Sequence, residues 1–150
     1  MGRWLGIDYG LRRIGLAIGD EQTSVTAGLR TIPAEKTASR NAEQIADIAK
    51  KEDANGIVVG LPLLMDGSDS PQTRLSRIFH AQLVERCDIP VALHDERLSS
   101  FQADLDLVDT GFSRKKRAAL RDTLAARRIL QSFFDTRRQE TDIGMGPQEC

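Results

Sequence analysis

Acidic residues stand in this chain where apolar segments end. Asp95 and Glu96 belong to HDERLSS, which follows the apolar run PVAL, and Asp8 lies near the end of the first apolar run, in GIDYG. Such side chains are almost never fully buried unless they are paired. Because ligands bind at the carboxyl ends of parallel strands, we expect these carboxylates to meet at one edge of a sheet.

A further acid comes from a helical segment near the C-terminus. A projection at about 100° per residue places Asp122 in the middle of an apolar arc. The arc consists of Ala118, Ala125, Ala126, Ile129 and Phe133. Clustered carboxylates repel one another unless a cation or protons neutralise them, and Mg²⁺ prefers carboxylates, waters and phosphate oxygens. The three segments together therefore predict a divalent-metal site that handles phosphate groups.

Each acid taken singly also has a simpler explanation. Asp8 could cap a turn, Asp122 could pair with an arginine or a backbone end, and Asp95 could form a local ion pair in a solvated loop. The convergence of three separate segments favours the shared site. His94 could serve as a base or a metal ligand, but the apolar strand before it favours a structural hydrogen bond. Asp66, in the loop LPLLMDGS, is expected to shape the cleft and not to act in catalysis.

Basic residues surround the predicted site. The projection gathers several arginines of the last helix within about 60° of one another, beside its apolar face. Contacts to backbone phosphates by such residues are independent of sequence and sensitive to salt. The expected nucleic-acid-binding residues are Arg97, Arg114, Lys115, Lys116, Arg117, Arg121 and Arg128. A solvated helix start is the alternative for SRKKR, and Arg97 could hold either a phosphate or the neighbouring acid.

Short strands and amphipathic helices must position these residues. Three apolar runs joined by short turns predict antiparallel strands, and the later runs alternate with helical patterns, which is typical of parallel strands. The expected fold is α/β, a five-stranded mixed sheet with helices on both faces. The predicted strands cover 3–9, 12–20, 25–32, 56–62 and 90–94, and the predicted helices begin near Ser39 and Ser70 and cover 99–109 and 113–137.

The composition sets the remaining limits. The 150 residues carry a net charge of -1 and include two cysteines, which suits one domain in a reducing compartment. We expect a domain over residues 1–138, a disordered tail over 139–150, a cytoplasmic location and no contact with membranes. Because aromatic residues are few, recognition of nucleic acid by shape and charge is favoured over base stacking.

Four motifs in order resemble one family. They are GIDYGLRRIGLAIGD, VVGLPLLMDG, HDERLSS, and SRKKR followed by DTLAARRIL. This set closely resembles the YqgF/RuvX family of RNase H-like nucleases, which includes pre-16S rRNA nucleases and Holliday junction resolvases. The resemblance implies that Asp8, Glu96 and Asp122 are the catalytic acids and the ligands of Mg²⁺ or Mn²⁺ in a two-metal site. Asp95 would be a neighbour, and the run AALRD departs from the lysine usual before the helix aspartate.

The substrate stays open between two nucleic acids. The resemblance favours processing of the 5′ end of pre-16S rRNA, with resolution of four-way DNA junctions as the alternative. Symmetric junction cleavage would need two active sites and hence a homodimer, which no heptad pattern indicates. A binding or ribosome-assembly factor without catalysis is a further alternative. An actin-like ATPase would also begin with a phosphate-cradling hairpin, but it needs two such domains.

Overall fold

The computed structural model describes residues 2–98 and 113–142 and contains one five-stranded sheet in the order β3-β2-β1-β4-β5. Strands β1, β2 and β3 are antiparallel, whereas β1, β4 and β5 are parallel, so the predicted mixed sheet is confirmed. The strands are β1 (Arg3–Tyr9), β2 (Arg13–Asp20), β3 (Val25–Pro33), β4 (Gly56–Leu61) and β5 (Val91–Asp95). The helices are α1 (Ala38–Lys51), α2 (Pro71–Arg86), the short 3₁₀ helix η1 (Glu96–Leu98) and α4 (Arg114–Asp142).

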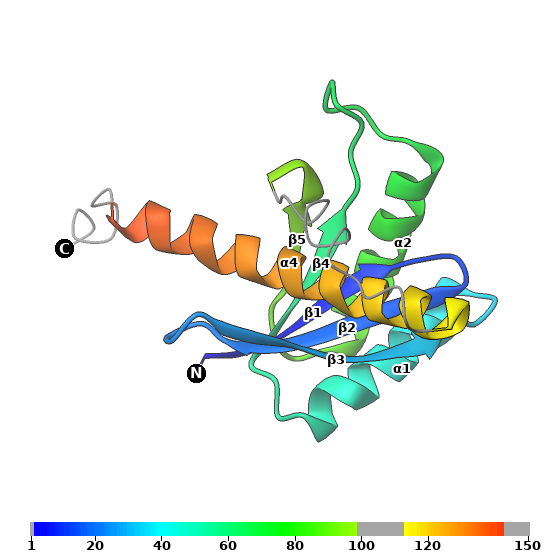
Figure 1. Ribbon diagram of the computed structural model, residues 1–150, viewed down its shortest axis with the longest axis horizontal. Coiled ribbons are helices and arrows are strands. Elements are labelled where there is room, and N and C mark those ends of the chain that lie inside the picture. Colours follow the sequence, from blue (N-terminus) through cyan, green and yellow to red (C-terminus); the bar gives the residue numbers. More distant parts are fainter. Residues whose placement is uncertain (1, 99–112, 143–150) are drawn as a thin grey trace.

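The helices form a layer on each side of the sheet. Helix α4 lies across one face, and α1 and α2 cover the other (Figure 1). Side chains alternate between the faces along each strand, so Trp4 packs with α4 while Leu5 and Ile7 pack on the α1 side. By the same alternation Asp8 belongs to the α4 face. No helix in the described ranges is long and apolar enough to cross a membrane.

Helix α4 approaches the sheet closely because glycines line its path. A Cβ at Gly15 would lie 2.1 Å from the carbonyl oxygen of Asp122, and one at Gly6 would lie 3.0 Å from that of Ala126. These distances leave no room for a side chain between helix and strands. The glycines of β1 and β2 therefore set how deeply the helix, and Asp122 with it, sits on the sheet.

The helix starts differ in part from the sequence prediction. Helix α2 begins as expected, with Ser70 as N-cap and Pro71 in the first turn. Helix α1 is capped by Thr37 and not by Ser39, because the Thr37 hydroxyl accepts a hydrogen bond from the amide of Arg40. Helix α4 continues to Asp142, past the expected domain end at 138.

The sequence pattern predicts an apolar face of α2 formed by Leu75, Ile78, Phe79, Leu83 and Val84, but only Phe79 and Leu83 are buried. The other three residues of that face are exposed, namely Leu75, Ile78 and Val84. The stripe that the helix buries instead continues through Thr73 and Ser76. The Thr73 hydroxyl donates a hydrogen bond to the carbonyl of Pro62, which removes the cost of burying a polar group. The predicted helix over 99–109 lies outside the described residues.

Candidate active site

Asp8 stands on the α4 face near the carboxyl end of β1. It is paired across the sheet with Gly15 of β2, the residue on which the backbone of Asp122 rests. Burial, and after it the nearby charge of Asp122, raises the pKa of the Asp8 carboxyl to about 6. Asp8 is therefore a partly buried carboxyl with a second acid, Asp122, close by.

Glu96 reaches the same face from the end of β5, at the start of η1. A Cβ at Gly60 of β4 would lie 2.7 Å from a carboxylate oxygen of Glu96, so this carboxylate lies directly over Gly60. Burial, followed by the charges of Asp8 and Asp95, raises the pKa of Glu96 to about 7. Strand β4 lies between β1 and β5, and its glycine leaves the space in which the two carboxylates approach each other.

Asp122 comes from α4 and has a cationic partner. Its carboxylate accepts a hydrogen bond from Nε of Arg13 at 2.6 Å, and its side chain is 20% exposed. The prediction that Asp122 sits in the middle of a buried apolar arc is therefore only partly correct. The centre of the buried stripe lies one turn further along, at Ala126 and Ile129, and Asp122 lies at its margin, where an arginine can reach it.

The structure thus brings the three predicted acids to one edge of the sheet, but they are not close enough together to form a complete set of metal ligands. Within residues 2–98 and 113–142, no three His, Cys, Asp or Glu side chains are close enough to hold a metal ion. Asp8 and Glu96 nevertheless fit a hard divalent cation, because each carboxyl resists ionisation partly through the charge of a neighbouring acid. Asp122 carries a carboxylate of the same kind, and Arg13 bonds to its Oδ2.

The raised pKa values predict how stability depends on pH in the absence of metal. Between the ordinary pKa of Asp, 3.8, and about 6, the folded protein binds more protons at Asp8 than the unfolded chain does. The stability that Asp8 contributes is therefore fully present below the pKa of the unfolded chain and is lost as the pH rises through the pKa of the folded protein. Glu96 acts in the same direction up to about pH 7. The melting temperature in EDTA should fall between pH 5 and pH 7.5; a rise across that interval would contradict the assigned environment.

Asp95 and Arg97 form a local ion pair, which was the simpler of the predicted roles. The guanidinium of Arg97 donates to both carboxylate oxygens of Asp95 and to the carbonyl of Met65. The hydrogen bonds from Arg97 hold the pKa of Asp95 below its usual range. Arg97 therefore holds the loop after β4, which projects from the rest of the protein (Figure 1). For Arg97 to contact nucleic acid as expected, these hydrogen bonds would have to change.

Asp66 holds the turn of this loop. The Asp66 carboxylate accepts hydrogen bonds from the amide and the hydroxyl of Ser68, which closes the turn. Gly67 adopts a φ of 89°, a conformation that other residues rarely take, and it lies against the guanidinium of Arg97. The hydrogen bonds of the Asp66 carboxylate are therefore made within its own turn.

His94 has the structural hydrogen bond that the sequence predicted. The buried imidazole bonds through Nε2 to the hydroxyl of Ser132 on α4 at 2.8 Å, and its ring meets the edge of Phe133. Burial lowers the pKa of His94, which keeps the ring neutral near pH 7. This bond fastens the end of β5 to α4, two residues before Glu96.

The predicted nucleic-acid-binding residues of α4 divide into two groups. Four are exposed, namely Arg114, Lys115, Lys116 and Arg121, and two, Arg117 and Arg128, are half-buried. Arg13 of β2 was not among the residues predicted from the sequence, yet its Nε donates a hydrogen bond to Asp122, one of the predicted catalytic acids. Strand alternation was the available signal, since Arg13 and Gly15 of β2 share the face that Asp8 occupies.

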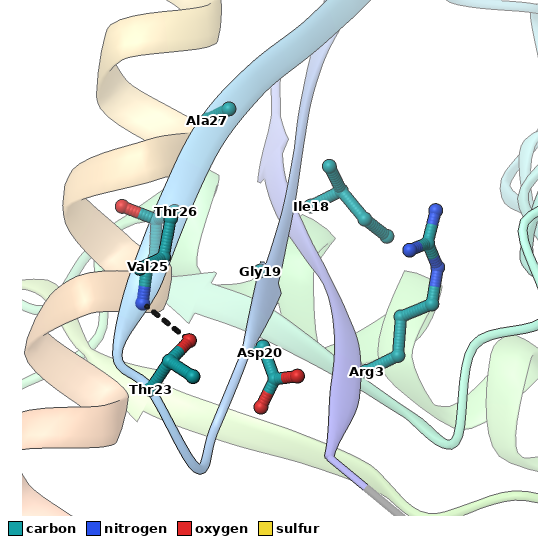
Figure 2. Close-up of a pocket in the computed structure, with 8 residues that line it drawn as sticks. All are labelled: Arg3, Ile18, Gly19, Asp20, Thr23, Val25, Thr26 and Ala27. Carbon is teal, nitrogen blue, oxygen red and sulfur yellow. Dashed lines mark hydrogen bonds between the residues drawn. The ribbon is translucent and has the colours of Figure 1, made fainter.

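A hollow lies at the far end of the sheet, away from the three acids (Figure 2). It has a volume of about 510 Å³ and is lined by the start of β1, the end of β2 and the start of β3. Asp20 and Arg3 are the ionisable side chains that line it, and the hydrogen bond drawn there only joins Val25 to Thr23 of the same turn. The chemistry-bearing residues lie at the opposite end of the strands.

Comparisons with known proteins agree with this architecture. The RuvX family model, described as Holliday junction resolvase, matches residues 2–136. A protein of Nitratidesulfovibrio vulgaris (strain DSM 19637 / Miyazaki F), with the name "Putative pre-16S rRNA nuclease", is 44% identical over 133 residues, which are 89% of this chain and 93% of that protein. A protein of the same name from Anaeromyxobacter sp. (strain K) is 40% identical over 135 residues, 90% of this chain and 98% of that protein.

The fold is also found in a solved structure. RuvC of T. thermophilus in complex with a Holliday junction substrate matches with a TM-score of 0.59 and 14% sequence identity, over 93% of this chain and 97% of that one. At this identity the match shows that the two chains share the RNase H-like fold. The family model spans all four motifs that carry the acids and the basic helix start. The chain therefore belongs to the RuvX family.

Proposed function

We propose that this protein is a metal-dependent endonuclease that hydrolyses phosphodiester bonds in structured RNA and processes the 5′ end of pre-16S rRNA. The observation that carries the proposal is the convergence of Asp8, Glu96 and Asp122 from three separate elements on one sheet edge. The names of the two relatives described above support RNA as the substrate. A soluble cytoplasmic protein is consistent with this role.

The carboxylates would hold the cofactor, Mg²⁺ or Mn²⁺. When bound, one or two divalent cations would activate a water molecule and stabilise the leaving oxygen. Asp8 lies between the other two acids and would be the central ligand, with Glu96 and Asp122 completing the site from β5 and α4. Gly60 keeps the space over β4 open for the ligand set. His94 positions the end of β5 through its bond to Ser132.

The start of α4 would hold the backbone of the nucleic acid. A shallow hollow of about 280 Å³ lies between β3 and this part of α4, and Arg30 and Lys116 are the cations that line it. Exposed lysines and arginines of the first helical turns continue the positive surface toward Asp122. Such a surface attracts phosphates of any sequence and releases their counterions on binding.

This arrangement predicts the salt dependence of binding. Replacing Lys115 and Lys116 together by Ala should weaken binding of a pre-rRNA fragment and lower the slope of log K against log salt by about 1 to 2 units, because about two phosphate contacts are lost. The matched control is the pair Lys50 and Lys51, which are exposed at the end of α1 on the other side of the sheet. An equal effect of both double variants in fluorescence anisotropy titrations would contradict the assigned surface.

The deciding experiment compares two substrates. The purified protein is incubated with a pre-16S rRNA fragment and with a four-way DNA junction, in Mg²⁺ or Mn²⁺, beside the Asp8→Asn variant. Metal-dependent cutting of the RNA alone, absent in the variant, is the expected result. If neither substrate is cut although RNA is bound, the protein is a binding factor and the proposed activity is wrong.

Junction resolution is the second candidate. It is favoured by the description of the family model and by the fold shared with a RuvC that is bound to a Holliday junction. Resolution requires two sites acting on one junction, so a homodimer in solution together with paired symmetric nicks would make it the leading function. A monomer that cuts only RNA would exclude it.

A further inference from the structure

Arg13 lies at the acidic edge of the sheet, where its positive charge is next to the carboxylate of Asp122. Its Nε donates to Oδ2 of Asp122 at 2.6 Å, and this bond joins positions 109 residues apart in the chain. Strand β2 places Arg13 two residues from Gly15, on the face that carries Asp8 and against the helix that carries Asp122. The guanidinium therefore belongs to the acidic edge itself and is not a remote surface charge.

The bonding of Arg13 is weak compared with that of the other arginine nearby. Arg97 uses three nitrogens to hold both oxygens of Asp95 and the carbonyl of Met65. Among residues 2–98 and 113–142, Arg13 makes the single bond to Asp122, and 47% of its side chain is exposed. An ion pair that is partly exposed contributes little to stability, so Arg13 can leave its partner at small cost.

A second cation at this edge would meet Arg13 at Asp122. Arg13 bonds to Oδ2 of Asp122 at 2.6 Å, and Asp122 is one of the three acids that converge there. A divalent cation brings more positive charge to these acids than one guanidinium does. Both cations nevertheless require the same Asp122 carboxylate, and their binding to it is expected to compete.

We propose that Arg13 is the internal counter-ion of the site: it holds the Asp122 carboxylate in the metal-free protein and leaves it when Asp122 binds a divalent cation. The released guanidinium is then available to a phosphate oxygen of the nucleic acid, for which the planar arginine fork is well suited. This inference rests on the proposed function, because it requires that the three acids bind metal.

The test is direct titration of the full chain with Mn²⁺ in a calorimeter, without nucleic acid. The Arg13→Gln variant should bind Mn²⁺ about fivefold more tightly than the Arg12→Gln variant, which corresponds to the loss of one partly exposed ion pair. Arg12 is the matched control, because it is exposed, adjacent and equally charged. The Arg13→Lys variant, which keeps the charge, should stay within about twofold of the unmodified protein. Equal or weaker binding by Arg13→Gln than by Arg12→Gln overturns the inference.

A measurement on the unmodified protein guards against misfolding of the variants. The ¹⁵N resonance of Arg13 Nε should shift on addition of Mg²⁺ and its proton should exchange faster, because the bond to Asp122 is broken; an unchanged resonance at saturating Mg²⁺ overturns the inference. With saturating Mn²⁺, Arg13→Gln should also cut RNA more slowly. If the unmodified protein and Asp8→Asn both fail to bind metal, the proposed function fails as well, an outcome distinct from a failure that concerns Arg13 alone.

Discussion

The Asp8→Asn variant is expected to lose cleavage by about 10³-fold or more, equivalent to about 4 kcal/mol of transition-state stabilisation. Asp8 lies between the other two acids on the sheet edge, so its amide replacement removes the proposed central ligand and leaves the fold unchanged. The measurement is the single-turnover rate on the pre-rRNA fragment at saturating Mn²⁺. Residual activity above about a tenth of the original would remove Asp8 from the proposed machinery.

The same variant is expected to be more stable than the unmodified protein when no metal is present. Burial and the charge of Asp122 raise the pKa of Asp8 to about 6, so ionising it costs folding free energy above that pH. Its neutral replacement should raise the free energy of unfolding at pH 8 in EDTA by about 1 to 3 kcal/mol. The control is Asp47→Asn, at an exposed position of α1. A loss of stability in urea unfolding would contradict the environment assigned to Asp8.

The Gly15→Ala variant is expected to destabilise the fold by about 3 kcal/mol or more. The added Cβ would lie 2.1 Å from the carbonyl oxygen and 2.6 Å from the carbonyl carbon of Asp122. Backbone atoms within a helix cannot turn aside as a flexible side chain can, so α4 must move away from β2. The measurement is the midpoint of urea unfolding, and activity should fall too, because the shift carries the Asp122 carboxylate away from Asp8.

Gly2→Ala provides the matched control for this variant. The closest atom to a Cβ at Gly2 is Oδ1 of Asp20, at 2.9 Å, and that side chain can rotate. We expect a change below about 0.5 kcal/mol there. If Gly15→Ala is as stable and active as Gly2→Ala, the close approach of α4 to the sheet does not position the site.

Local signals in the sequence identified most of the fold. The turn residues between the first three apolar runs, the β-branched run of β4 and the Ser70-Pro71 start of α2 each act through neighbouring residues, and each prediction is confirmed. The face of α2 was partly wrong because its buried stripe includes Thr73 and Ser76, and the burial of Thr73 depends on its hydrogen bond to Pro62 in another segment. Hydropathy alone could not indicate this bond.

The sequence by itself determined the mixed α/β sheet, the order of its elements and the arrival of Asp8 and Glu96 at one strand edge, because strand period and parallel topology follow from local pattern. Only the tertiary structure decided how charged groups are paired. Arg97 joins Asp95 and the loop after β4, and Arg13 joins Asp122 across 109 positions. Electrostatic partners are chosen by distance in space and by burial, and these depend on how closely α4 packs on Gly15, a property of the whole assembled sheet.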